Sequence, residues 1–359
     1  MPARACSRAP PAQPFLARLP GAAKPGGRGW GVPDRCLPRF SVRNRLVAAF
    51  SAAAVSALLL SGCAGAAEAP DPTSSPSAGS CLLDAQPGAA SDAVEVTGSG
   101  ADLDVRVPGD LEIEDVERTV LRDGDGDDVA ANDLVSLRYR IVDATDNTVL
   151  DSSDRGEGGE LPVLLEPNQA SLFLVALECR PLGSQVVLAL PGSALGEGSN
   201  PVVVYAEATE ELPLQATGEP VAPEKDMPAV ELADDGTPSI TIPNTDAPTQ
   251  TRVATLKKGD GPTVQSGDLV VVQYKGVKWS DGSEFDSSWS RGAPTQFPTT
   301  GVVPGFQAAL EGQTVGSQVV VEMPPADAYG TDQYKDHELH DESLVFVVDI
   351  LATTPAPQQ

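Results

Sequence analysis

Apolar runs separated by turn residues dominate the last third of the chain. They lie at 269–274, 316–323 and 343–351, and a short helical pattern between the first two ends at Leu310. Strands of this length that are joined by turns pair readily as neighbours in an antiparallel sheet, and one short helix can cover a face of it. The pattern therefore predicts an α+β domain in which an antiparallel sheet is wrapped around a short helix.

Aromatic residues gather at the ends of these runs and in the loops between them. They could line one apolar pocket, in which Asp286 and the tyrosine hydroxyls would be the few polar groups. An aromatic cluster in a small β domain also serves as plain core, so the pattern by itself leaves both interpretations open. The aromatic residues are Tyr274, Phe285, Phe297, Phe306, Tyr329 and Phe346.

The same pattern occurs about 135 residues upstream. Gly183–Val187 and Gly316–Val320 both read Gly-Ser-Gln-Val-Val, and Asp133–Val135 and Asp268–Val270 both read Asp-Leu-Val. Such self-similarity predicts two copies of one domain. The predicted divisions are 82–213 for the first copy, 214–225 for a linker, 226–352 for the second copy and 353–359 for a tail.

The first 62 residues form a separate segment. Residues 1–40 are rich in Pro, Arg, Ala and Gly, and from Arg43 a basic stretch leads into the apolar run Leu46–Leu60. A basic stretch followed by about fifteen apolar residues is typical of a secretory signal and too short for a dedicated membrane span. We expect residues 1–62 to be an extension with a signal peptide, and the segment 63–81 to be a flexible tether.

The end of that signal, Leu60-Ser61-Gly62-Cys63, resembles a bacterial lipobox. The resemblance implies that Cys63 becomes the lipid-modified N-terminus of the mature protein. The protein would then be anchored to the outer face of the bacterial cell membrane, with this lipid as its sole membrane contact. An ordinary signal peptide or an anchor helix is the alternative.

The five cysteines divide by position. Cys6 and Cys36 precede the expected cleavage site, and Cys63 would carry the lipid, so Cys81 and Cys179 remain. An even pair in an exported, oxidising setting predicts a disulfide between them. Two free buried thiols are the alternative.

The formal net charge of −27 is unevenly distributed. Residues 1–62 hold nine Lys or Arg and one Asp, so the remaining 15 basic and 50 acidic residues carry −35. A chain this acidic is poorly suited to bind nucleic acid or an anionic membrane surface, because both repel it. The charge favours a soluble monomer.

Six short motifs of the second copy form an ordered set within about eighty residues. They are V-x-Y-x-G at 272–276, F-D-S-S at 285–288, V-P-G-F at 303–306, G-S-Q-V at 316–319, A-Y-G at 328–330 and L-V-F-x-V at 344–348. Each motif alone is weak, but their order and spacing closely resemble the FKBP-type peptidyl-prolyl cis-trans isomerases. The resemblance implies two tandem FKBP-like domains and an isomerase that acts on proline-containing exported polypeptides with no cofactor and no metal.

The resemblance also assigns roles to residues of the second copy. The Val303 backbone N–H would bind the carbonyl of the substrate proline, and the Tyr329 hydroxyl would bind the carbonyl on the far side of that ring. Tyr274 and Arg291 would hold Asp286, whose carboxylate would face the twisted amide. The catalytic set is thus Tyr274, Asp286, Val303 and Tyr329, and the substrate-binding set is Phe285, Arg291, Phe297, Val302, Phe306 and Phe346.

The second copy departs from the family pattern at three places. Thr295 stands where the family has an aromatic residue. Phe306 stands where the family often has Trp, which implies weak macrolide binding. The segment 331–341 carries Pro and Ile in the family, whereas Tyr334 or Leu339 would supply the apolar contact here.

The first copy loses residues that the resemblance places in the pocket. Leu150 aligns with Phe285, and Leu195 roughly with Tyr329. We therefore expect the first copy to be a degenerate domain that serves as a scaffold or binding module. Its Asp151, which aligns with Asp286, could simply cap a turn.

Other interpretations of the polar clusters are weaker. His337 and His340, with Glu338 and Asp341, could suggest a metal site, but their spacing is common and the acidic segment is expected to be solvated. The Asp-rich run 123–128 could suggest calcium, yet the aligned positions in the second copy include lysines, which favours a plain turn. For the whole protein, a non-catalytic chaperone or interaction lipoprotein that retains the fold is the alternative function.

Overall fold

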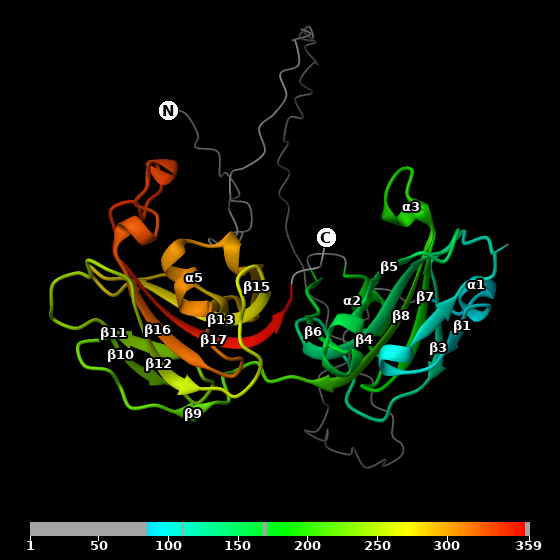
Figure 1. Ribbon diagram of the computed structural model, residues 1–359, viewed down its shortest axis with the longest axis horizontal. Helices are drawn as coiled ribbons and strands as arrows, with labels where there is room; N and C mark the ends of the chain where they lie inside the picture. The colour runs from blue at the N-terminus through cyan, green and yellow to red at the C-terminus, as the bar shows by residue number, and fades with distance from the viewer. Residues whose placement is uncertain (1–84, 110, 168–170, 356–359) are drawn as a thin grey trace, which may run out of the picture. The chain divides into compact units, whose positions relative to one another are not determined.

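The computed structural model describes residues 85–109, 111–167 and 171–355 (Figure 1). The predicted signal peptide, tether, Cys63 and Cys81 therefore lie outside the described residues. Within the described ranges, no helix has the length and apolar character needed to cross a membrane.

The first copy is built on an antiparallel sheet of strand order β3-β7-β8-β4-β5, and β6 also pairs with β4. The helix α2 packs Leu174 and Leu177 against apolar residues of this sheet. Its elements are β3 Glu117–Arg122, β4 Leu134–Asp143, β5 Val149–Ser152, β6 Leu161–Leu164, α2 Leu172–Leu177, β7 Gln185–Leu190, α3 Gly192–Leu195 and β8 Val202–Glu211.

The second copy repeats this arrangement with strand order β14-β13-β17-β16-β12-β9, in which β9 is Glu219–Pro220, and β15 also pairs with β13. Its helix α5 takes the place of α2 (Figure 1). The elements are β12 Arg252–Lys258, β13 Leu269–Lys278, β14 Glu284–Ser287, α4 Ser288–Arg291, β15 Thr295–Pro298, α5 Pro304–Leu310, β16 Gln318–Met323 and β17 Leu344–Thr354. This α+β architecture with two antiparallel sheets confirms the predicted fold class.

Each sheet is covered on both faces, and the second covering layer was not predicted. Along β16, Val319 and Val321 pack in the core with α5, whereas Val320 packs with Val230 and Ile240 of a hairpin. Successive side chains of a strand point to opposite faces, so the helix and the hairpin cover opposite sides. The hairpin of the second copy is β10 Ala229–Leu232 with β11 Pro238–Thr241, and that of the first copy is β1 Glu95–Thr97 with β2 Asp104–Arg106, preceded by α1 Ala89–Asp92.

The segment predicted as a linker takes part in the second sheet. Glu219–Pro220 forms β9, which pairs with β12 at the sheet edge. The Ala216 N–H donates to Asp349 Oδ2 of β17 at 2.8 Å, and the Gly218 N–H donates to the Gly316 carbonyl at 2.9 Å. These bonds satisfy the backbone of the segment and tie it to the second copy.

Short 3₁₀ helices connect several of these elements. Two of them, η7 and η8, flank Tyr329 in the second copy. The bounds are η2 Gly100–Asp102, η3 Ser153–Arg155, η4 Glu157–Gly159, η6 Thr299–Gly301, η7 Pro325–Asp327 and η8 Asp332–Tyr334.

Candidate active site

Four aromatic rings form a connected cluster between the second sheet and α5. Phe306 of α5 lies at the centre, with its ring centroid 5.0 Å from that of Phe346, 5.6 Å from Phe297 and 5.9 Å from Tyr274. All three pairs meet edge to face, the arrangement that the ring quadrupoles favour. Phe285 joins the cluster through Phe346 at 5.4 Å and stays half-buried, so its ring forms the outer part of the cluster.

Gly276 of β13 makes room for two of these rings. A Cβ at this position would lie 2.6 Å from Phe285 Cζ and 2.7 Å from Phe346 Cε1. Real Cβ atoms do not approach ring carbons this closely. Position 276 lies two residues after Tyr274, so it is on the same face of the strand as the aromatic cluster. The glycine of V-x-Y-x-G is therefore required, because the rings pack directly against its backbone.

The Asp286 carboxylate is held by two donors. The Tyr274 hydroxyl donates to Asp286 Oδ2 at 2.5 Å, and Arg291 Nη1 donates to the other carboxylate oxygen. Arg291 Nη2 also donates to the Tyr274 hydroxyl at 2.8 Å, which closes a triangle of three side chains. Burial and the neighbouring Asp286 charge raise the pKa of Tyr274, so its hydroxyl remains a donor at neutral pH.

The two serines of F-D-S-S hold the loop that carries Asp286. Ser288 Oγ accepts the Tyr274 backbone N–H at 2.8 Å, which ties the loop to β13. Ser287 caps α4 by accepting the Ser290 N–H at 3.3 Å, and α4 ends at Gly292 with φ +79°. This short helix places Arg291 against Asp286. The sequence analysis included both serines in the F-D-S-S motif but assigned them no role, although their position directly after Asp286 was the available signal.

Val303 presents a backbone donor at the start of α5. It is the N-cap residue of this helix, and its carbonyl accepts from the Phe306 and Gln307 N–H groups. In the described part of the chain its own N–H donates to no acceptor. The position before a helix leaves such donors unsatisfied, so this N–H is available to a ligand carbonyl. Val302, which precedes it, packs against the buried core that contains the aromatic rings.

Tyr329 brings a second available donor. It follows η7 in a tight turn, where the Gly330 N–H donates to the Pro325 carbonyl at 2.6 Å. The residue is 3% exposed, yet its hydroxyl bonds to no other described residue. Burial, Asp286 and Tyr334 raise its pKa, so the hydroxyl keeps its proton at neutral pH. Most buried polar groups have a partner, which marks this hydroxyl as a candidate ligand contact.

The segment 331–341 reaches Tyr329 through aromatic residues. The Tyr334 ring meets the Tyr329 ring edge to face at 5.3 Å, and Leu339 is fully buried in the core of the second copy. His337 stacks on Tyr329 with ring centroids 4.1 Å apart. The acidic side chains of the segment are exposed, as the sequence predicted, while these three residues point inward.

The first copy retains more of the site than the sequence indicated. The Tyr139 hydroxyl donates to Asp151 Oδ2 at 2.9 Å, and Arg155 donates to Asp151 Oδ1 at 2.6 Å and to the Tyr139 hydroxyl at 3.2 Å. Asp151 thus does more than cap a turn, because it is the counterpart of Asp286 in a second triangle. The Phe173 ring lies 4.5 Å from Tyr139, as the counterpart of Phe306.

The first copy nevertheless lacks the counterparts of Phe285 and Tyr329, the two positions that are called the mouth of the site below. Leu150, where the second copy has Phe285, is 53% exposed, and Leu195, in the loop that corresponds to the Tyr329 turn, is 37% exposed. Neither side chain can donate a hydrogen bond. The first copy therefore keeps the buried triangle and loses both an aromatic wall and the tyrosine hydroxyl.

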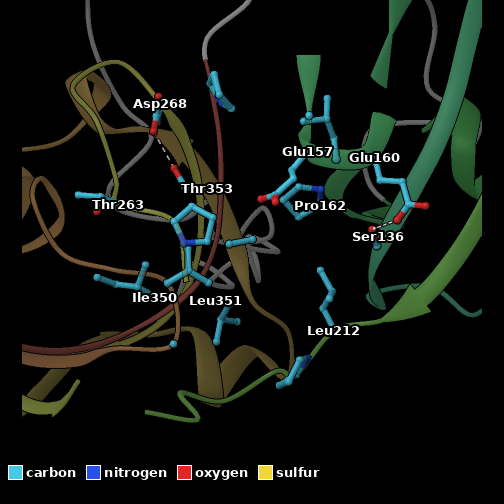
Figure 2. A pocket seen from close by; sticks show the side chains of 18 of the residues that line it. Ser136, Glu157, Glu160, Pro162, Leu212, Thr263, Asp268, Ile350, Leu351 and Thr353 are labelled. Carbon is cyan, nitrogen blue, oxygen red and sulfur yellow. Dashed lines mark hydrogen bonds between the residues drawn. The ribbon is translucent and has the colours of Figure 1, made fainter. Parts of the chain in front are cut away.

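A cavity with a different lining lies apart from this site. Figure 2 shows this cavity of about 520 Å³, whose lining includes Ser136, Glu160, Asp268, Ile350 and Thr353. The Asp268 carboxylate already accepts from the Thr353 hydroxyl at 2.9 Å, and Glu160 from the Ser136 hydroxyl at 2.9 Å. Of the predicted site residues that lie within the described ranges, none lines this cavity.

Cys179 is disulfide-bonded. Its predicted partner, Cys81, lies outside the described residues, so the pairing stays a prediction. The alternative of a free thiol at position 179 is wrong.

Comparison with known proteins matches the second copy to one family. The family model described as FKBP-type peptidyl-prolyl cis-trans isomerase matches residues 261–351. A probable FK506-binding protein of Corynebacterium glutamicum is 36% identical over 115 residues, which are 32% of this chain and 97% of that protein. An FK506-binding protein of Streptomyces anulatus is 35% identical over 118 residues, which are 32% of this chain and 95% of that protein.

Two solved structures are also similar. The crystal structure of FkpA from Escherichia coli has 31% identity and a TM-score of 0.29, over 37% of this chain and 54% of that chain. The structure of the three FKBP domains of wheat FKBP73 has 18% identity and a TM-score of 0.26, over 67% of this chain and 94% of that chain.

Proposed function

The chain belongs to the FKBP-type peptidyl-prolyl cis-trans isomerases, and from this premise we propose that its second copy is the catalytic domain, with Tyr274, Asp286, Val303 and Tyr329 as the reacting site. Enzymes of this family act on proline-containing polypeptides. The first copy, with its incomplete mouth, serves as a scaffold or binding module.

The reaction requires rotation about a peptide bond and cleaves none. The barrier is about 18–20 kcal/mol, because rotation breaks the conjugation of the C–N bond. The twisted amide has lost that conjugation and is less polar than the planar one. A water-poor aromatic site therefore stabilises the transition state more than the ground state, and this difference in binding accelerates the reaction.

The polar groups hold the substrate carbonyls on either side of the proline. The Val303 N–H and the Tyr329 hydroxyl are two available donors around the aromatic cluster. Asp286, fixed by Tyr274 and Arg291, places a carboxylate close enough to Tyr329 to raise the pKa of its hydroxyl. The Tyr329 hydroxyl is the observation that carries the proposal, because a carbonyl oxygen of bound substrate would satisfy this buried donor.

The proposal is tested by a proline-isomerisation assay on the full chain. We expect Tyr329→Phe to lower kcat/KM about tenfold, the effect of losing one hydrogen bond of about 1.5 kcal/mol. Asp286→Ala should lower it at least as much, because Tyr274 and Arg291 lose their shared acceptor. Asp151→Ala is the control, since it removes the same bonds in the first copy and should leave the rate unchanged.

Two outcomes would contradict the assignment. A rate that falls with Asp151→Ala and is indifferent to Asp286→Ala would place the activity in the first copy. A folded protein whose rate is unchanged in both second-copy variants would show that these residues do not form the reacting site.

We also propose that the protein is an exported lipoprotein that acts at the outer face of the cell membrane, anchored through Cys63. The apolar run before Leu60-Ser61-Gly62-Cys63 supports this proposal, and so does the disulfide at Cys179, because disulfides persist in oxidising compartments. Radiolabelled palmitate should label the wild-type protein and spare the Cys63→Ala variant. Equal labelling of the two proteins, or label in neither, would refute the anchor.

The names of the relatives lead to one ligand proposal. Weak binding of the macrolide FK506 is expected here, because Phe306 gives a smaller floor than the Trp found in many members of the family. Isothermal titration of the full chain with FK506 measures this affinity. Tight binding would show that the floor residue does not limit it.

A further inference from the structure

We propose that His337 is a positioning residue for Tyr329, whose ring it holds by flat stacking so that the phenol hydroxyl stays at the substrate site. This inference rests on the proposed role of Tyr329 in catalysis. It assigns a role in the reaction to a residue of the unusual segment 331–341.

The two rings are packed face to face. Their centroids lie 4.1 Å apart and their planes differ by 9°, whereas the other ring partner of Tyr329, Tyr334, meets it edge to face at 80°. One face of the phenol is therefore covered by the imidazole, and Tyr334 packs against the same ring. Both contacts come from residues within eight positions of Tyr329 along the chain.

The imidazole is itself anchored. The Leu339 backbone N–H donates to His337 Nδ1 at 3.2 Å, and the Leu339 side chain is fully buried in the core of the second copy. The buried leucine fixes the backbone, and the backbone N–H fixes the ring. Because Nδ1 accepts this bond, the proton of the neutral ring lies on Nε2.

Packing is what orients Tyr329. Its hydroxyl has no hydrogen bond to another described residue, so no polar contact sets the direction of the phenol before substrate arrives. A donor that is already in place loses less conformational entropy on binding, and a small misplacement of a contacting group can cost much of the rate. The flat stack supplies this orientation.

The stack does not require a charge on the imidazole. Burial lowers the pKa of His337 below its ordinary value of 6.5, although Glu338 acts in the opposite direction. The ring is therefore largely neutral at pH 7, and a phenylalanine at position 337 could form a similar stack.

The first test is a set of isomerisation rates on the full chain. His337→Ala should lower kcat/KM about threefold to tenfold, the effect of losing one aromatic pair, and His337→Phe should stay within about twofold of wild type. In a Tyr329→Phe background, His337→Ala should cause little further loss, because the hydroxyl that the stack positions is already absent. His340→Ala is the matched control: His340 is the other histidine of the chain, and its ring pairs with exposed Asp341.

The second test reports on the ring without using activity. With ¹³C-labelled tyrosine, the chain gives signals from five residues, and Tyr329→Phe identifies the Tyr329 signal. We expect His337→Ala to shift this signal and His340→Ala to leave it in place. His337→Phe should leave a ring-current shift on Tyr329, which is a signature that a general loss of stability would not produce.

The outcomes separate the two proposals. An unshifted Tyr329 signal in His337→Ala overturns the positioning role. The role is also overturned if His337→Ala lowers kcat/KM by the same factor in the Tyr329→Phe background as in the wild type. If Tyr329→Phe leaves the rate unchanged while His337→Ala still shifts the signal, the proposed role of Tyr329 in catalysis fails and the stack is structural.

Discussion

Gly276 and Ser288 lie beside the candidate site and carry none of its chemistry. Gly276 provides the space in which Phe285 and Phe346 meet, and Ser288 ties the Asp286 loop to β13 through the Tyr274 N–H. At the residue scale, the site therefore depends on small residues that let the rings and the carboxylate take their places.

Gly276→Ala should destabilise the second copy by about 1–3 kcal/mol, because the added methyl group would overpack two rings. Urea unfolding of the full chain, followed by tryptophan fluorescence, measures this change. Gly109→Ala is the control, since a Cβ at position 109 meets nothing within 4 Å. Equal free energies of unfolding for the two variants would contradict the prediction, because Phe285 and Phe346 would then accommodate the added methyl group without loss of stability.

At the element scale, β17 connects the candidate site to the segment 214–225, which precedes the second copy. Phe346 of this strand lies in the aromatic cluster. Three residues later, Asp349 is buried on the strand and accepts from the Ala216 N–H and from Gln318 Nε2 at 2.7 Å. Burial raises the pKa of Asp349, while the two donors lower it by less. The Asp349 carboxylate therefore holds the segment 214–225 against β17. Its burial also has a cost, because the charged carboxylate is removed from water.

That balance predicts a pH dependence. The raised pKa means that the folded state binds the Asp349 proton more tightly than the unfolded state does. The contribution of Asp349 to the free energy of unfolding is therefore largest below its ordinary pKa of about 4 and falls as pH rises through the raised value. Asp349→Asn removes this titration.

Urea unfolding of the wild type and of Asp349→Asn from about pH 4 to about pH 8 tests the prediction. The stability of the wild type relative to the variant should decrease over this range. A difference that stays constant with pH would show that Asp349 has the same pKa in both states.

At the scale of the whole molecule, one architecture supports two sites of unequal completeness. Both copies keep the tyrosine, aspartate and arginine triangle, which is partly buried and tied to the sheet. They differ at the mouth, where the first copy has the exposed Leu150 and Leu195 and the second copy has the half-buried Phe285 and the buried Tyr329. Substitutions at the mouth can therefore alter function while the fold remains.

The disulfide at Cys179 belongs to the first copy. Reduction should lower the free energy of unfolding of this copy by about 2–4 kcal/mol, because it releases a constraint on the unfolded chain. The isomerase rate should not change, since the proposed site lies in the second copy. Peptide mapping without reductant should recover Cys179 linked to Cys81, and a different partner would refute the predicted pairing.

The sequence by itself determined the strand pattern, the repeat and the family. These features rest on local signals. They are apolar runs with turn residues between them, and short motifs whose order and spacing can be read along a single chain. The resemblance to the family also implied that Tyr274 and Arg291 hold Asp286. In the structure, hydrogen bonds join these three side chains.

The tertiary structure decided the features that depend on contacts between distant segments. Strands as short as β10 and β11 carry too little periodicity to reveal that they cover a sheet face. The arginine of the first triangle, Arg155, is shifted by one position relative to its counterpart, so alignment alone did not reveal it. The stack of His337 on Tyr329 depends on how the intervening turns fold, and no local pattern encodes that path.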